Sequence, residues 1–134
     1  MSQIRYVKYQ NKSQMEGVSG KWYLKVKHTE TIELPELAKH MAAHNTSFSR
    51  GQILGILTDM TDCMREMMLD GKKIKLSDLA IFSLGVRCKG ADKAENATPA
   101  NIVGIRFNAQ GTGENAPAAI YEKVKFKEQD EYSV

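Results

Sequence analysis

Two stretches near the start of the chain alternate between apolar and polar residues. They cover residues 4–9 and 21–29, and a polar loop with two glycines joins them. Alternation with a period of two is typical of a strand with one buried face. The pattern therefore predicts an antiparallel pair of strands within residues 1–30. The apolar face of the second strand consists of Trp22, Leu24 and Val26, and we expect this face to pack on the body of the protein.

A helical period follows the two alternating stretches. The segment Leu34-Pro35-Glu36 predicts the start of a short helix, because proline fits a first helical turn and glutamate complements the helix dipole there. A second, longer helix is predicted over about residues 50–69. Its start has the pattern of a capping box, with Ser49 followed three residues later by Gln52, and Gly71 supplies a left-handed stop at its end.

The longer helix carries an apolar stripe that is rich in methionine. Its members recur at helical spacing: Ile53, Ile56, Leu57, Met60, Met64, Met67 and Met68. A methionine cluster can bind a metal or a ligand, but flexible thioether side chains more commonly fill irregular gaps between apolar surfaces. We therefore interpret the stripe as core or dimer interface, and we expect a chain this short to need a partner subunit to cover it.

After the helices the period of two returns. Residues 72–76 predict a strand with a basic and an apolar face, residues 79–88 a second strand, and residues 101–108 a third. The stretch between the last two strands is polar and loop-like, and Pro99 belongs at its edge because proline cannot donate to a sheet ladder. Pro117 then predicts a short helix, which a charged tail follows. This order of elements gives an α+β fold.

Composition places the chain in a broad class. Of its 134 residues, 42% are hydrophobic and 26% are charged, as in an ordinary globular domain. No apolar run approaches the roughly 18 residues that cross a bilayer, and the first residues lack the apolar core of a signal peptide. Cys63 and Cys88 form neither a disulfide framework nor a metal-ligand set. We therefore expect a soluble, intracellular protein without membrane contact.

The net charge of +3 hides an uneven distribution. Residues 1–30 and 71–107 each carry a net +4, whereas residues 31–70 carry −3 and residues 108–134 carry −2. Ordinary surface variation also produces such alternation, so the pattern alone does not decide the function. Phosphate binding nevertheless depends on local basic density rather than on the total, and here positive charge is concentrated on the predicted strands.

The sequence contains no convincing catalytic or metal-binding constellation. His40 and His44 have the i, i+4 spacing of two metal ligands, but no third ligand stands at a matching position. The Gly111-Thr112-Gly113 segment lacks the third glycine and the βαβ context of a phosphate-binding loop. We therefore expect a non-enzymatic protein with no cofactor, no metal and no small-molecule substrate.

The lysines of the second alternating stretch have two interpretations. Lys21, Lys25 and Lys27 can form a phosphate-facing surface, or they can be the solvated face of a strand that packs through its apolar face. Trp22 and Tyr23 can stack on unpaired bases, as in single-strand binders. Nothing else in the sequence resembles an OB-fold barrel, so we favour the solvated face.

The order and spacing of elements from residue 34 onward resemble the histone-like DNA-binding family typified by HU and integration host factor (IHF). The segments that carry the resemblance are Leu37-Ala38, Ser49-Arg50, Asp70 to Leu76, Leu79 to Leu84 with Phe82 at the family's core phenylalanine, and Asn101 to Phe107. The alternating N-terminal extension and the short C-terminal segment resemble the divergent Bacteroidetes-type branch of this family. The implied domains are an N-terminal extension (residues 1–30), an HU/IHF-like DNA-binding domain (31–125, with a β-arm at about 87–106) and a charged tail (126–134).

The resemblance implies a function and a set of site residues. It implies an IHF-like fold in an intertwined homodimer of the bacterial nucleoid, in the cytoplasm. Such a dimer binds and bends duplex DNA through minor-groove β-arms and a basic saddle, with weak sequence specificity. The implied DNA-binding residues are Arg50, Lys72, Lys73, Lys75, Arg87, Lys89, Lys93, Pro99 and Arg106. The implied core and dimer-interface residues are Ile53, Ile56, Leu57, Met60, Met64, Met67, Phe82 and Phe107.

The arm of this chain departs from the family pattern. A typical arm carries several arginines and an Arg-Asn-Pro tip, whereas here Asp92 and Glu95 stand beside Lys93, and Pro99 is the available counterpart of the wedge proline. Fewer cations neutralise fewer phosphates, so we expect weak binding with a shallow salt dependence. The alternative is a protein-interaction or scaffold module on the same fold, with little affinity for DNA.

Overall fold

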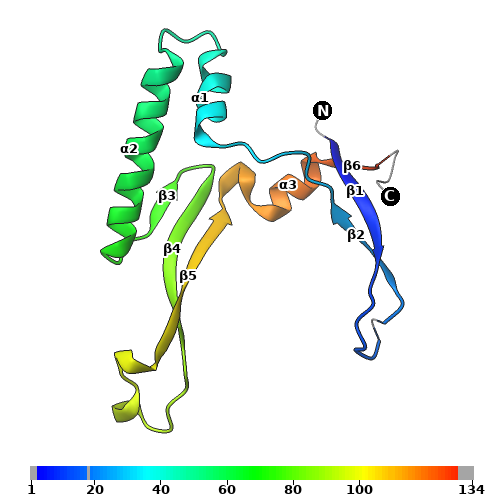
Figure 1. Cartoon of the computed structure of the whole chain (residues 1–134), viewed down its shortest axis with the longest axis vertical. Helices are drawn as coiled ribbons and strands as arrows, with labels where there is room; N and C mark the ends of the chain where they lie inside the picture. Colours follow the sequence, from blue (N-terminus) through cyan, green and yellow to red (C-terminus); the bar gives the residue numbers. More distant parts are fainter. Residues whose placement is uncertain (1–2, 18, 130–134) are drawn as a thin grey trace. The chain divides into compact units, whose positions relative to one another are not determined.

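The computed structural model describes residues 3–17 and 19–129. These residues form three α-helices and two three-stranded sheets, a mixed α+β fold (Figure 1). The chain divides into two compact units. The terminal unit contains the described parts of Met1–Ile32 and Ile120–Val134, and the central unit contains Glu33–Ala119. No helix in the described part of the chain is both long and apolar enough to span a membrane.

The terminal unit is built on a sheet with the strand order β2-β1-β6. Strands β1 (Gln3–Gln10) and β2 (Trp22–Val26) pair antiparallel, as the two alternating stretches predicted. Strand β6 (Lys125–Glu128) pairs parallel to the other edge of β1. Whether the apolar face of this sheet packs on the body of the protein stays a prediction.

Strand β6 differs from the charged tail that we expected over residues 126–134. Its alternating side chains continue the two faces of the sheet, with Phe126 beside Ile4 and Lys127 beside Arg5. This pairing satisfies backbone groups on an edge of β1 that would otherwise face solvent. Residues 130–134 lie outside the described residues, and residues 120–125, which we placed in the DNA-binding domain, group with the terminal unit.

Helices α1 (Leu34–Ala42) and α2 (Arg50–Leu69) open the central unit at the predicted positions. The expected capping box is present on α2: the Gln52 N–H donates to Ser49 Oγ at 3.1 Å, and the Ser49 N–H donates to Gln52 Oε1 at 2.8 Å. Gly71 follows the helix with φ of 83°, the left-handed conformation that ends helices and that glycine adopts without strain.

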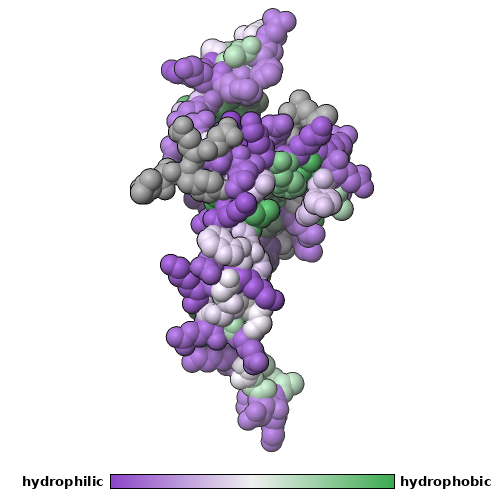
Figure 2. All heavy atoms as spheres, turned by 90° about the vertical axis from the view of Figure 1, so that its right-hand side faces the viewer, coloured by the Kyte–Doolittle hydropathy of each residue, from purple (hydrophilic) through white to green (hydrophobic). Residues whose placement is uncertain are grey.

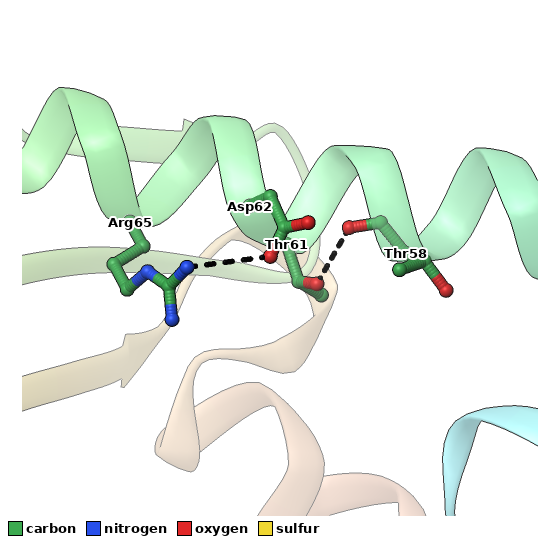
Figure 3. A network of polar contacts seen from close by, with 4 residues as sticks. All are labelled: Thr58, Thr61, Asp62 and Arg65. Carbon is green, nitrogen blue, oxygen red and sulfur yellow. Dashed lines mark hydrogen bonds and ion pairs between the residues drawn. The ribbon is translucent and has the colours of Figure 1, made fainter.

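One side of α2 is polar and satisfies its side chains locally. The Thr58 hydroxyl donates to the Leu54 carbonyl at 2.8 Å, and the Thr61 hydroxyl donates to the Thr58 carbonyl at 2.9 Å. One turn further, Arg65 and Asp62 form an exposed i, i+3 ion pair at 3.5 Å (Figure 3). These contacts need no partner from another element.

The second sheet of the central unit has the strand order β3-β4-β5, with both pairs antiparallel. Strand β3 (Ile74–Leu76) is shorter than the strand predicted over residues 72–76. Lys72 and Lys73 lie before it, in the connection from α2. Strands β4 (Ala80–Cys88) and β5 (Ile102–Gly111) continue well beyond β3 as a two-stranded ribbon, which Figure 1 shows extending past the end of α2. We call this ribbon, with the tip loop over residues 89–101, the arm.

Short elements complete the chain. The tip loop contains two single 3-10 turns, η1 (Ala94–Asn96) and η2 (Pro99–Asn101). After β5, a further 3-10 turn η3 (Gly113–Asn115) leads into the predicted C-terminal helix, α3 (Pro117–Lys123). At the base of the sheet, the Thr112 hydroxyl donates to the carbonyl of Ser77 at 2.6 Å and the Asn115 amide donates to the carbonyl of Asp78. These bonds fix the end of β5 to the turn between β3 and β4.

Candidate nucleic-acid interface

The register of the second sheet collects polar side chains on one of its faces. Residues at paired positions of adjacent strands point to the same face of a sheet. The ladder pairs Lys75 with Ile81, and Ile81 with Gln110, and further along it pairs Ser83 with Asn108. The complete polar face consists of Lys75, Ser83, Arg87, Arg106, Asn108 and Gln110, with Ile81, Gly85 and Gly104 between them. Two of the three strands therefore contribute cations to the arm, and the third contributes Lys75 at its base.

Each arginine of the arm stands opposite a glycine. The ladder pairs Arg87 with Gly104 and Arg106 with Gly85. The guanidinium of Arg87 lies across Gly104, since a Cβ atom added to that glycine would come within 2.7 Å of Nη2. A side chain at either glycine would occupy space on the polar face beside an arginine. The arrangement keeps two cations two rungs apart on the same face of a narrow ribbon, each with a glycine as its directly opposite neighbour.

The remaining arm residues of the predicted set lie in the tip loop. Lys89 closes the ribbon, because its N–H donates to the Asn101 carbonyl at 2.8 Å. Lys93 precedes η1, and Pro99 opens η2 on the return side of the loop. All three residues are exposed, and the lowest part of Figure 2, which is the tip of the arm, shows hydrophilic residues beside a few apolar ones. Glu95 is exposed in the same loop and, with Asp92, brings the net charge of residues 89–101 to zero.

The predicted saddle residues lie where α2 passes into β3. Lys72, Lys73 and Lys75 are all exposed. Lys72 forms an ion pair with Asp70 at 3.4 Å, with both side chains largely solvated. Exposed pairs of this kind contribute little to stability, and a phosphate can displace the carboxylate at small cost. Within the described part of the chain, Lys72 is the one cation of the predicted set that forms an ion pair.

Arg50 does not lie with these cations within one chain. It is the first residue of α2, and Lys72 follows the last turn of that helix. A helix of 20 residues is about 30 Å long, so the two side chains start from opposite ends of α2. A single chain therefore offers two separated positive regions, one at the start of α2 and one on the sheet and arm.

The opposite face of the sheet is apolar and lines an open groove of about 490 Å³ against α2. Phe82 and Phe107 lie in this groove with ring centroids 6.2 Å apart. The groove is lined from α2 by Met60, Thr61, Met64, Arg65, Met68 and Leu69, and from β3, β4 and the turn between them by Leu76, Leu79, Phe82 and Leu84, with Phe107 from β5. Its volume and apolar character show a packing surface that this chain leaves uncovered.

The predicted core and interface residues differ in burial. Ile53 is buried, Leu57, Met64 and Phe82 are half-buried, and Ile56, Met60, Met67 and Phe107 are exposed. The described residues include only three buried hydrophobic side chains, at Ala38, Ile53 and Met68. Ile56 is 61% exposed and Phe107 is 62% exposed, values far from those of a core residue. The apolar stripe of α2 is thus only partly covered by its own chain.

Sequence reasoning missed the polar partners on the sheet face. Ser83, Asn108 and Gln110 lie on the same face as the arm arginines, and none was singled out. Alternation within β4 and β5 assigns each residue to one of two faces, but it does not say which faces of the two strands coincide. The register supplies that information, and it also identifies Gly85 and Gly104 as the neighbours of the arginines.

The two helix histidines come together without forming a metal site. Their Nε2 atoms lie 3.0 Å apart on the surface of α1 and the segment after it. Among the described residues, no group of three or more His, Cys, Asp or Glu side chains is arranged to hold a metal ion.

Comparisons with known proteins agree with this architecture. The chain matches, over residues 1–113, the HU-HIG family, described as an HU domain fused to wHTH, Ig, or Glycine-rich motif. This match covers most of the chain, so the protein belongs to this family of HU-domain proteins. The comparison with curated protein sequences gave no match.

A solved structure shares the fold. It is the crystal structure of a candidate bacterial DNA-binding protein from Bacteroides vulgatus ATCC 8482, with a TM-score of 0.68 and 12% sequence identity. The similarity covers 99% of this chain and 50% of that one, so this chain spans about half the length of the protein it resembles. At this identity the likeness concerns the fold.

Proposed function

We propose that this protein binds duplex DNA and that its central unit is an IHF-like DNA-binding domain. The observation that carries the proposal is the polar face, on which Lys75, Arg87 and Arg106 share one side of a sheet that continues into an arm. An exposed ribbon with cations on one face can enter a groove and place those cations against phosphates on both sides. Membership of the HU-domain family supports the same function.

The proposed mechanism assigns a role to each group of predicted residues. Lys72, Lys73 and Lys75 form a saddle under the duplex, and the arm follows the minor groove. Arg87, Lys89, Lys93 and Arg106 are the proposed phosphate contacts of the arm. Pro99, in the tip loop, is the proposed wedge that opens a base step and bends the duplex. Sequence preference then arises from the deformability of the DNA rather than from contacts to base edges.

We further propose that two chains form a homodimer through the apolar groove and the stripe of α2. Ile56 and Met67 are exposed apolar side chains of α2, and the exposed Phe107 lines the open groove. Complete burial of one such side chain contributes about 1.5–3 kcal/mol, so covering several of them on two chains can stabilise a dimer. A dimer also has two arms, two saddles and two copies of Arg50 on one assembly. Arg50 is the proposed contact to a flanking phosphate, at the start of a helix.

The small number of cations limits the expected affinity. Each phosphate contact contributes about 0.9 to the slope of log affinity against log salt concentration. Because Asp92 and Glu95 share the tip loop with Lys93, we expect a slope shallower than roughly −8. Weak, poorly selective binding fits a nucleoid-associated protein of the cytoplasm that acts on DNA without cofactor or small-molecule substrate.

An electrophoretic mobility shift with duplex DNA tests the proposal. At about 50 mM salt and micromolar protein we expect a shift, which weakens at moderate salt. No shift under these conditions would favour the second candidate, a protein-interaction or scaffold module. The acidic residues of the tip loop are the observation that favours that alternative.

A further inference from the structure

The sheet of the terminal unit has one basic face, which the proposed DNA-binding domain does not include. The ladder places Arg5 beside Lys127 of β6, and the Lys27 N–H donates to the Arg5 carbonyl at 2.8 Å on the other side. Three cations therefore form one row across the sheet. Lys25, beside Val7, and Lys125, beside Gln3, add two more cations to the same face.

The described ladder positions of this face contain no carboxylate. Like charges at directly opposite positions of a sheet destabilise it, and neighbouring strands are only about 4.8 Å apart. The one acidic residue of β6, Glu128, lies on the other face, where it forms an ion pair with Lys8 at 3.3 Å. The described ladder puts no acidic residue beside Arg5, Lys25, Lys27 or Lys125, so these four cations form a surface that an external anion would stabilise.

Two tyrosines lie next to these cations. Tyr9 and Tyr23 are paired across β1 and β2, and their ring centroids are 5.9 Å apart. The ammonium of Lys25 lies 5.4 Å from the centroid of the Tyr9 ring. Tyr9 is exposed and Tyr23 is half-buried, so both rings are accessible from the basic face.

A shallow groove of about 760 Å³ borders this face. Val7, Tyr9, Lys25 and Lys27 line it from the basic face, and the rest of its lining is Lys8 and Val26 of the opposite face with His28 and Gln129. The opposite face of the sheet is mainly apolar, with Tyr6, Leu24, Val26 and Phe126 on the same side as the Lys8–Glu128 ion pair. The basic face thus combines cations with tyrosine rings, and Lys25, Lys27 and Tyr9 also line the groove.

We propose that this basic face is a second nucleic-acid-binding surface, which binds an unpaired strand. The cations contact the phosphates, and Tyr9 and Tyr23 provide a platform on which bases stack. A sheet surface with cations and aromatic rings is the arrangement that binds single strands, since every base has a face to stack and the backbone follows the positive groove. An anionic membrane surface would use the cations but would not need the tyrosine pair.

The full chain is tested with a fluorescently labelled oligothymidylate of about 12 nucleotides, a length within the usual site sizes of single-strand binders. The Lys25→Gln/Lys125→Gln double variant removes two phosphate contacts. We expect the slope of log affinity against log salt to become shallower by about 1.4, and the affinity at about 0.1 M salt to fall about 25-fold. The matched control is Lys12→Gln/Lys39→Gln, which makes the same charge change outside this face and is expected to leave the slope unchanged.

Two further variants test the tyrosine platform. Tyr9→Ala is expected to weaken oligothymidylate binding at least about fivefold, while Tyr9→Phe, which keeps the ring, stays close to wild type. Circular dichroism confirms that each variant is folded. Equal affinities of Tyr9→Ala and Tyr9→Phe would overturn the stacking role.

The test separates this surface from the proposed arm. Arg87→Gln/Arg106→Gln is expected to weaken duplex binding and to leave oligothymidylate binding intact. The proposal is overturned if the Lys25/Lys125 variant loses affinity only for duplex DNA, or if it binds oligothymidylate like wild type. It is also overturned if the protein binds vesicles containing about one-third phosphatidylserine but no oligonucleotide. Because the two pairs of variants act on different probes, failure of this proposal and failure of duplex binding are distinguishable.

Discussion

Gly104 provides a direct test of how the arm positions Arg87. An added Cβ atom at Gly104 would lie 2.7 Å from Nη2, 3.1 Å from Nε and 3.3 Å from Cζ of Arg87. Ordinary contacts begin near 3.4 Å, so in Gly104→Ala the guanidinium must move by about 0.7 Å or rotate off the ribbon. The backbone of Gly104 is not in the left-handed region, and the group that must move is the end of a flexible side chain. We therefore expect the free energy of unfolding to change by less than about 1 kcal/mol.

The expected effect is on DNA rather than on folding. If counterion release is the main contribution, each lost phosphate contact lowers duplex affinity about eightfold at about 0.1 M salt, or roughly 60-fold for a dimer that loses two. Arg87→Gln is expected to show the full loss, and Gly104→Ala part of it, by fluorescence anisotropy with a labelled duplex. Gly90→Ala is the matched control, because a Cβ atom at Gly90 meets nothing within 4 Å and its φ is not positive.

A double-mutant cycle decides whether the two residues act together. When Arg87 is already glutamine, the added methyl group at Gly104 has no guanidinium to displace, so we expect almost no further loss. Equal losses from Gly104→Ala in the wild-type and Arg87→Gln backgrounds would refute the reasoning. So would wild-type duplex affinity of Gly104→Ala itself, since the position of Arg87 would then not matter.

Three further predictions concern the dimer, the helix cap and the wedge. Ile56→Glu is expected to raise the dimer dissociation constant at least about 30-fold in sedimentation equilibrium, because covering a side chain that is 61% exposed contributes about 2–4 kcal/mol over two copies. Met15→Glu is the control. Equal dimerisation of both variants would show that α2 is not part of the interface. Ser49→Ala is expected to lower the free energy of unfolding by about 1 kcal/mol and the Tm by about 4 °C, since the Gln52 N–H loses its acceptor. Ser49→Asp keeps an oxygen at this position and is expected to have a Tm near that of wild type. An unchanged Tm for Ser49→Ala would show that the cap contributes nothing to stability. Pro99→Ala is expected to reduce DNA bending, measured by fluorescence energy transfer between the duplex ends, more than it reduces affinity, and identical transfer efficiencies would rule out the wedge.

Local signals predicted the helices of this protein well. Pro35, Ser49, Gln52 and Gly71 act within a few residues of their own position, so their meaning does not depend on the rest of the fold. The sequence also predicted the length of α2. A rise of about 1.5 Å per residue then sets the distance between Arg50 and Lys72 at the two ends of the helix.

Pairing between distant strands was the part that the sequence did not reveal. Strand β6 is four residues long and pairs with a strand more than a hundred positions earlier, so nothing local distinguishes it from a charged tail. The basic faces of both sheets have the same origin. Alternation assigned Lys25 and Arg87 each to one face of its own strand. Only the register showed that Lys125 lies on the same face of the first sheet as Arg5, and that Gly104 lies opposite Arg87 in the second sheet.

The measurement that tests the central claim most directly is the salt dependence of duplex binding for Arg87→Gln/Arg106→Gln. We expect wild type to have a slope shallower than roughly −8, and we expect the slope of the variant, which loses four contacts per dimer, to be shallower by about 3.6. Lys12→Gln/Lys39→Gln, with the same change in net charge, is predicted to keep the wild-type slope. A slope in the arginine variant equal to that of wild type would contradict the claim that the polar face of the arm contacts DNA.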